Sequence, residues 1–215
     1  MSESAIAAAL AQPDPATLER LERYAALLRD CNQRINLVSR KDIDNLEARH
    51  LAPCVLPARF LTLAPGARVL DVGTGGGLPG LVLAVLYPHV EFLLVDAVAK
   101  KVAAVQEMAE ALELPNVQTD QLRVQHLRKG FDFVVGRAVT NLADFLDWTL
   151  PRVKPDKGLH SLANGVLYWK GGDLEPELAE RGRQPAQLWK FEALLPGLGL
   201  DGKYIAYFPA NNVRT

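Results

Sequence analysis

A glycine-rich segment that follows a short apolar stretch constrains this chain more than any other feature. Residues 69–80 read Val-Leu-Asp-Val-Gly-Thr-Gly-Gly-Gly-Leu-Pro-Gly, so five glycines fall within eight positions. Glycine has no Cβ, so it can adopt a positive φ and lets a ligand touch the backbone. An apolar, helix-like stretch follows. The order of strand, glycine-rich turn and helix predicts a nucleotide-type binding site; a purely structural tight turn is the other interpretation.

Asp71 determines which nucleotide-like ligand we expect. A pyrophosphate binds to backbone N–H groups, and the glycines at 75, 77 and 80 match the dinucleotide fingerprint formally. However, a carboxylate at Asp71 would repel a pyrophosphate and would suit a cationic amine. S-adenosylmethionine (SAM) carries a sulfonium and an ammonium but no phosphate. We therefore predict that Asp71 and Gly75 contact SAM.

A second acid stands at the end of the next apolar stretch. Val90–Val95 predicts a buried strand, and Asp96 ends it, about 25 residues after Asp71. An acid at this place accepts hydrogen bonds from ribose hydroxyls. Because NAD and SAM both contain such a ribose, Asp96 does not distinguish them. Together, the two acids and the glycine loop favour SAM.

Size and composition set the class of protein. The chain has 215 residues and a net charge of −1, which fits one domain plus an extension without a global basic field. We expect no membrane span, because no apolar run reaches 18 residues, and no signal peptide, because the N-terminus lacks a basic start. The two cysteines and four histidines lack metal-type spacing, so we expect reduced thiols, no metal and a cytoplasmic location.

The N-terminal part is helical in pattern and precedes the α/β part. Residues 16–31 carry apolar side chains at spacings of three and four. A second helical stretch is expected at 43–56, broken by Pro53 and Pro57. We predict a helical cap over residues 1–62 and a second domain over 63–215, packed together as one unit.

Strands and helices alternate from Arg68 onward, which predicts an α/β fold with a mostly parallel sheet. The predicted strands are 69–72, 90–95, 117–119, 131–136, 165–170, 187–192 and 203–208. The predicted helices are 78–86, 97–112, 142–150 and 174–181, and Pro79 fits a first helical position. The last two strands leave no room for a helix between them, so we expect an antiparallel hairpin. This layout is typical of the Rossmann-like, seven-stranded SAM-dependent methyltransferases.

Charge is distributed unevenly along the chain. Residues 34–68 contain six basic residues against three acids, and residues 120–170 contain eight against five, so each segment has a charge of +3. A basic face is compatible with docking on folded RNA or a ribonucleoprotein. Ordinary mixed surface charge is the alternative. The basic residues are Arg34, Arg40, Lys41, Arg49, Arg59, Arg68, Arg123, Arg128, Lys129, Arg137, Arg152, Lys154, Lys157 and Lys170.

Several motifs resemble one family, ribosomal RNA small subunit methyltransferase G, also called glucose-inhibited division protein B. The resemblance covers about residues 18–208, and its most specific element is the loop ending in Leu-Pro-Gly. The other matching elements are Asn36-Leu37-Val38-Ser39, Arg49-His50-Leu51, Asp96 with Lys100-Lys101, Arg137-Ala138 and Lys170-Gly171. The chain departs from the family pattern at Cys31, Pro53, Cys54, Gln125 and Lys203.

The resemblance implies an activity and a set of contacts. It implies methyl transfer from SAM to N7 of a guanine, at position 527, in 16S rRNA of the small ribosomal subunit. The family's SAM contacts correspond to Gly73, Leu78, Val124, Gln125 and Arg137. Naked rRNA, an assembly intermediate and the finished subunit all remain open as the substrate form, and we expect a monomer.

Guanine N7 has a free lone pair, so the reaction needs positioning and no strong base. Arg137 follows an apolar strand at the sheet edge where ligands bind, and it can clamp the SAM carboxylate, a phosphate or guanine O6. Lys170 ends another strand at that edge and is a candidate for RNA backbone contact. His50 and Asn36 are RNA-contact candidates that equally suit structural roles in the cap and a turn.

Two other functions fit the same residues. A small-molecule SAM-dependent methyltransferase would use the N-terminal helices as a lid and would have a closed apolar pocket. A non-catalytic Rossmann-type binding module would bind NAD and turn nothing over. The hypothesis of an rRNA methyltransferase predicts an open basic cleft beside the glycine loop.

Overall fold

A seven-stranded sheet forms the centre of the computed structural model, which describes residues 4–10, 14–39, 42–128, 130–156, 158–181 and 184–210. The strand order is β3-β2-β1-β4-β5-β7-β6. Strands β1 to β5 run parallel, whereas β7 runs antiparallel to both β5 and β6. The strands are β1 (Arg68–Val72), β2 (Glu91–Asp96), β3 (Val117–Gln121), β4 (Phe133–Arg137), β5 (Gly165–Gly171), β6 (Gln187–Lys190) and β7 (Lys203–Pro209).

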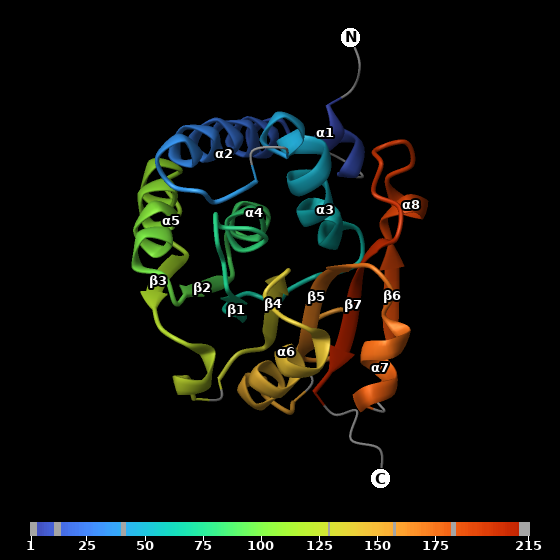
Figure 1. The fold of residues 1–215 in the computed structure, drawn as a ribbon. Helices are drawn as coiled ribbons and strands as arrows, with labels where there is room; N and C mark the ends of the chain where they lie inside the picture. Colours follow the sequence, from blue (N-terminus) through green and yellow to red (C-terminus); the bar gives the residue numbers. More distant parts are fainter. Residues whose placement is uncertain are drawn as a thin grey trace.

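Helices cover both faces of this sheet (Figure 1). One face carries α4 (Gly80–Leu86) and α5 (Ala99–Ala111), and the other carries α6 (Leu142–Thr149) and α7 (Glu175–Arg181). The N-terminal elements lie outside α4 as a further layer. They are α1 (Ala5–Ala9), α2 (Pro15–Arg34), the short turns η1 (Ile43–Asn45) and η2 (Glu47–Leu51), α3 (Ala52–Val55) and η3 (Leu56–Arg59).

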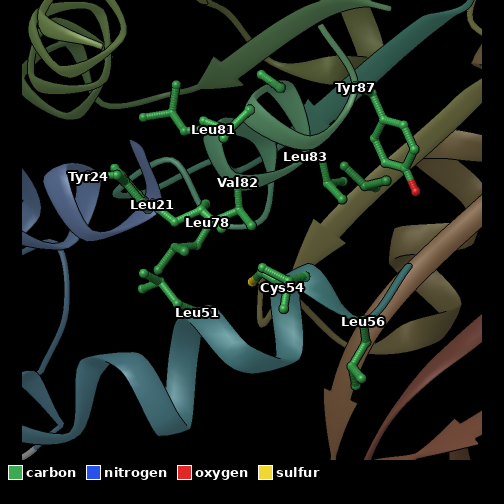
Figure 2. Close-up of a cluster of buried hydrophobic side chains, with 14 of the residues drawn as sticks. Leu21, Tyr24, Leu51, Cys54, Leu56, Leu78, Leu81, Val82, Leu83 and Tyr87 are labelled. Atoms are coloured by element: carbon green, nitrogen blue, oxygen red, sulfur yellow. The ribbon is translucent and has the colours of Figure 1, made fainter. Parts of the chain in front are cut away.

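The composition of α4 explains why this extra layer exists. Its sequence, Gly-Leu-Val-Leu-Ala-Val-Leu, has no polar face, and the residues from Gly80 to Val85 are all buried. A helix that is apolar all round must be covered on all sides. The sheet covers one side, and Figure 2 shows Leu21 and Tyr24 of α2, with Leu51 and Cys54, meeting the side chains of α4 on the other. One buried cluster therefore joins the N-terminal helices to the sheet domain.

The predicted fold class is confirmed, and all seven predicted strands are present. Three details differ. The strand predicted at 187–192 ends at Lys190, because α8 (Phe191–Leu194) begins there, so a short helix does separate β6 from β7. The second helical stretch is divided near Pro53 and Pro57, as predicted, but it continues to Arg59 beyond its predicted end at residue 56. Each proline lies at the start of a new short segment, whose first N–H groups need no helical partner. Pro79 precedes α4 as its N-cap residue.

Candidate functional site

The glycine loop after β1 is a tight turn held against β2. Gly73, Gly75 and Gly77 have φ values of +66°, +59° and +93°, a region that favours glycine. The amide of Thr74 donates to the carbonyl of Val95 at 3.0 Å, and the amide of Gly77 donates to Thr74 at 2.8 Å. A Cβ placed on Gly75 would meet only the carbonyl of Gly73, at 3.9 Å. The loop therefore leaves open space beside Gly75, as a site for a ligand would.

Asp71 lies beneath this loop, in a position different from the one we expected. Its side chain is fully buried, and Oδ2 accepts hydrogen bonds from the Thr74 hydroxyl at 2.7 Å and the Gly80 amide at 3.0 Å. Burial raises the pKa of Asp71 to about 7, against the opposing effect of these two hydrogen bonds. Asp71 thus ties the loop to the first turn of α4 and lines neither of the two cavities described next.

Asp96 lines a cavity of about 260 Å³ at the carboxyl ends of β1 and β2. Its Oδ2 accepts the Gly75 amide at 3.1 Å, and its Oδ1 accepts the Val98 amide at 2.9 Å. We name this space the Asp96 cavity. It brings together four of the predicted cofactor residues: Gly73, Asp96, Val124 and Gln125. Its other walls are Val72, Val95, Ala97, Leu122, Arg123, Val139 and Trp148.

A second cavity, of about 190 Å³, opens at the carboxyl ends of β4 and β5. We name it the His50 cavity. It brings together His50, Arg137 and Lys170, which the sequence places far apart, and adds two further cations, Arg49 and Lys203. Its remaining walls are Pro53, Ala138, Trp169, Gly171 and Phe191. Cations therefore outnumber acids at this largely apolar cavity, although Arg49 is paired with Asp42 at 3.2 Å, and this excess of positive charge suits an anionic ligand.

The segment after β4 separates the two cavities. Ala138 lines the His50 cavity and its neighbour Val139 lines the Asp96 cavity. Ala138 has a φ of +53°, so the chain turns sharply there. The Tyr168 hydroxyl fixes the turn, because it accepts the amides of Val139 and Thr140 at 3.1 and 3.2 Å and donates to the Thr140 carbonyl at 2.6 Å. The two cavities are therefore direct neighbours.

His50 and Arg137 form a pair inside the basic cavity. The Arg137 guanidinium contacts Nδ1 of His50, and because a guanidinium can only donate, Nδ1 must accept. Burial and the nearby Arg137 charge lower the pKa of His50 to about 4, so the imidazole is neutral at pH 7. Its proton then sits on Nε2. In the described part of the chain this buried atom has no hydrogen-bond partner.

Lys170 is held by an acid in this structure. Its Nζ lies 2.7 Å from Oε1 of Glu177 on α7, and Oε2 of the same carboxylate accepts the amide of Leu142 at 2.6 Å. Burial is the largest single effect and raises the pKa of Glu177, but the hydrogen bonds from Lys170 and from the Leu142 amide, with the Lys170 charge, together lower it. Glu177 therefore connects the His50 cavity to the start of α6.

Comparison with known proteins identifies the family. The family model described as "GidB: rRNA small subunit methyltransferase G" matches residues 17–195. The chain belongs to the rRNA small subunit methyltransferase G family. A curated member from Flavobacterium psychrophilum is 46% identical over 170 residues, which cover 78% of this chain and 81% of that protein. Another, from Cytophaga hutchinsonii, is 37% identical over 195 residues, covering 89% and 93%.

The fold comparison agrees with family membership. A ribosomal protein L11 methylase from Lactobacillus delbrueckii subsp. bulgaricus matches with a TM-score of 0.51 and 15% identity, over 68% of this chain and 70% of that one. At this identity the match concerns the fold alone. The predicted resemblance to the rRNA small subunit methyltransferase G family is confirmed, and as a member of this family the protein uses SAM.

The Asp96 cavity has features that fit SAM. Both oxygens of Asp96 are fixed by backbone amides, and Gly75, which supplies one of these amides but does not itself line the cavity, has open space beside it. A preorganised carboxylate of this kind suits ribose hydroxyls. Gly73, Asp96, Val124 and Gln125 would hold the cofactor. Arg137, predicted to contact both SAM and substrate, lines only the His50 cavity.

Two predicted contact residues lie elsewhere. Leu78, expected from the family resemblance to contact SAM, is buried in the cluster shown in Figure 2, beside Leu21 and Tyr24. Asn36 is exposed on the segment after α2 and lines neither cavity. Four residues of the predicted basic face, Arg40, Lys41, Lys129 and Lys157, lie outside the described residues.

The sequence reasoning missed Val139, Tyr168 and Glu177. No local signal marks Glu177, because its partner Lys170 stands seven residues away across a turn. Tyr168 lies within an apolar strand, and the sequence around it does not indicate which groups its hydroxyl would hydrogen-bond. In the described ranges, no group of three histidines, cysteines or acids could hold a metal ion, and no helix has the length and apolarity needed to cross a membrane.

Proposed function

We propose that the protein transfers a methyl group from SAM to N7 of a guanine in 16S rRNA, the guanine at position 527 that the family resemblance implies. The observation that supports this most is the adjacency of the two cavities: Arg137 and Ala138 line the His50 cavity, and the next residue, Val139, lines the Asp96 cavity. One has the features expected of a SAM site, and its neighbour is basic. Because a single chain contributes both cavities, we propose that the protein acts as a monomer. With rRNA as the substrate, it would act in the cytoplasm.

The chemistry needs little from the protein beyond alignment. Bound SAM supplies an electrophilic methyl group, and guanine N7 already carries a free lone pair. The residues must hold N7, the methyl carbon and the sulfur in line. In agreement, the groups near the cavities are poor bases or nucleophiles: burial keeps His50 only weakly basic and raises the pKa of Cys54 to about 12.

The basic cavity would hold the RNA. Arg137 can donate to a phosphate or to guanine O6, whereas Nε2 of His50 is buried and lies 4.0 Å from Oδ2 of Asp42. Arg49 and Lys203 stand at the same cavity and add positive charge. This arrangement favours a polyanion over the apolar substrate of a small-molecule enzyme with a helical lid. Of the N-terminal elements, α2 packs on the glycine loop, whereas η2 and α3 supply Arg49, His50 and Pro53 to one wall of the His50 cavity.

Lys170→Ala tests the RNA side of the proposal. We expect kcat/KM for the RNA substrate to fall by about tenfold or more, because a charge-assisted contact is lost. The dissociation constant for SAM should change by less than about twofold, since Lys170 lies outside the Asp96 cavity. Steady-state kinetics and calorimetry measure the two quantities.

Lys154→Ala is the matched control for Lys170→Ala. Lys154 also pairs with an acid, Asp132, at 3.0 Å, but at the opposite edge of the sheet. Its loss should leave both constants nearly unchanged. A larger effect of Lys170→Ala on SAM affinity than on RNA turnover would instead assign Lys170 to the cofactor site.

The decisive experiment identifies the methylated nucleotide. The protein is incubated with labelled SAM and small ribosomal subunits from a strain that lacks this activity, and the label is mapped by primer extension and mass spectrometry. Label at N7 of the single expected guanine supports the proposal. Label on no RNA, with turnover of small molecules from a cell extract, would replace it with the lidded small-molecule methyltransferase.

A further inference from the structure

The glycine loop is bonded on its outer side by a residue of the N-terminal helix α2. The hydroxyl of Tyr24 donates to the carbonyl of Gly76 at 2.8 Å, across 52 residues of sequence. Tyr24 is fully buried. Burial raises the pKa of its hydroxyl, so the group keeps its proton and acts as a donor. Figure 2 shows Tyr24 close to Leu78, the residue that ends the loop.

Two leucines reinforce this contact. A Cβ on Gly76 would lie 2.9 Å from Cδ1 of Leu28 and 3.3 Å from Cβ of Leu37, so both side chains pack directly on the Gly76 backbone. Leu37 is itself fixed, because Oδ1 of Asn32 accepts its amide at 2.8 Å. The end of α2 and the segment after it therefore form a wall against one side of the loop.

The other side of the loop is bonded to the sheet. Thr74 donates its amide to Val95, and Gly75 donates its amide to Asp96. Gly75 begins a run of three glycines that ends at Gly77, and the peptide planes of such a run can rotate at little steric cost. The hydrogen bond from Tyr24 fixes the direction of the Gly76 carbonyl within this run. The peptide that follows Gly76 is thus held at both ends, its carbonyl by the Tyr24 hydroxyl and its N–H, that of Gly77, by the Thr74 carbonyl.

We propose that Tyr24 is a positioning residue for SAM: it holds the Gly76 peptide so that Gly75 and Asp96 keep the arrangement that receives the cofactor. Tyr24 does not itself line the Asp96 cavity. The N-terminal helix is thereby a structural component of the cofactor site and more than a cover for apolar surface. This inference rests on the proposed use of the Asp96 cavity for SAM.

Tyr24→Phe tests this inference, with Tyr87→Phe as a matched control. The Tyr87 hydroxyl is also buried and also donates to a distant backbone carbonyl, that of Leu61, at 2.8 Å. It lies away from the glycine loop. Both variants lose one hydroxyl and one buried hydrogen bond, so their melting temperatures should fall by similar amounts. SAM affinity is measured by calorimetry well below both melting temperatures.

We expect Tyr24→Phe to raise the dissociation constant and the KM for SAM by about three- to tenfold, the effect of leaving one buried acceptor unpaired. The kcat and the KM for RNA should stay within about twofold. Tyr87→Phe should leave all four values unchanged. Hydrogen exchange should show faster exchange of the amides of residues 75–78 in SAM-free Tyr24→Phe, and no such change in Tyr87→Phe.

The outcomes separate this inference from the proposed function. If the wild-type protein fails to bind SAM, the proposed function itself is wrong. If the wild type binds SAM and Tyr24→Phe binds it equally well, with unchanged exchange at residues 75–78, Tyr24 is merely structural and the inference is overturned. Equal loss of SAM affinity in Tyr24→Phe and Tyr87→Phe would also overturn it, because a general loss of stability would then explain both.

Discussion

Gly75→Val should abolish SAM binding while the protein remains folded. Gly75 has a φ of +59°, where a side chain costs about 1–2 kcal/mol, and a β-branched residue costs more. The folded chain nevertheless has room for it, since a Cβ would meet only the Gly73 carbonyl at 3.9 Å. The new side chain would therefore fill the space that we assign to the ligand. Calorimetry should detect no binding at SAM concentrations about 100-fold above the wild-type dissociation constant.

Gly66→Val provides the control for backbone strain. Gly66 has a φ of +74° and nothing within 4 Å of its would-be Cβ, but it lies before β1, at the other edge of the sheet. The two variants should lose similar stability in thermal denaturation, and only Gly75→Val should lose SAM. Wild-type affinity in Gly75→Val would refute the assignment of the glycine loop to the cofactor.

Asp96→Ala should weaken SAM binding by roughly 1–3 kcal/mol, which corresponds to about 5- to 150-fold in the dissociation constant. Two effects add. The carboxylate no longer accepts from the ribose, and the amides of Gly75 and Val98 lose their acceptor, which loosens the loop. Asp96→Asn keeps one oxygen and should fall between the wild type and Asp96→Ala.

A SAM analogue that lacks the ribose 2′-hydroxyl separates the two effects. The wild type should bind this analogue more weakly than SAM, whereas Asp96→Ala should discriminate little between them. Asp132→Ala is a suitable control, because Asp132 is also buried and also accepts a backbone amide, that of Arg68 at 2.8 Å, but far from the cavity. An undiminished preference for the hydroxyl in Asp96→Ala would count against the ribose contact.

The strand and glycine pattern was sufficient to predict the sheet and the tight glycine turn after β1. The same pattern led us to expect Asp71 beside the ligand, but the alternation of side chains along β1 explains why it lies elsewhere. Side chains two apart share a face, so Asp71 lies on the side of Val69, and the start of α4 covers that side. Asp71, the acid on which the prediction of SAM rested, therefore stabilises the glycine loop through buried hydrogen bonds. Asp96, at the end of the neighbouring strand β2, lines the Asp96 cavity.

The His50 cavity depended on contacts that no local pattern encodes. His50 and Arg137 stand 87 residues apart and meet because η2 and the end of β4 lie near the same sheet edge. The family resemblance identified His50 and Arg137 separately as candidate site residues and did not predict that they would be in contact. The neutral state of His50 follows from burial beside Arg137, which is a property of the assembled fold. Likewise, the capture of Lys170 by Glu177 requires the turn between β5 and α7.

The apolar helix α4 has a consequence for folding of the chain during its synthesis. Its outer side is covered by α2, η2 and α3, and these N-terminal elements in turn have apolar side chains in the same buried cluster. During synthesis the N-terminal segment leaves the ribosome first, before the surface against which it packs exists. We therefore expect the N-terminal segment of the nascent chain to stay unfolded or chaperone-bound until residues 80–86 have emerged from the ribosome. The glycine loop should become ordered when the N-terminal helices pack on α4.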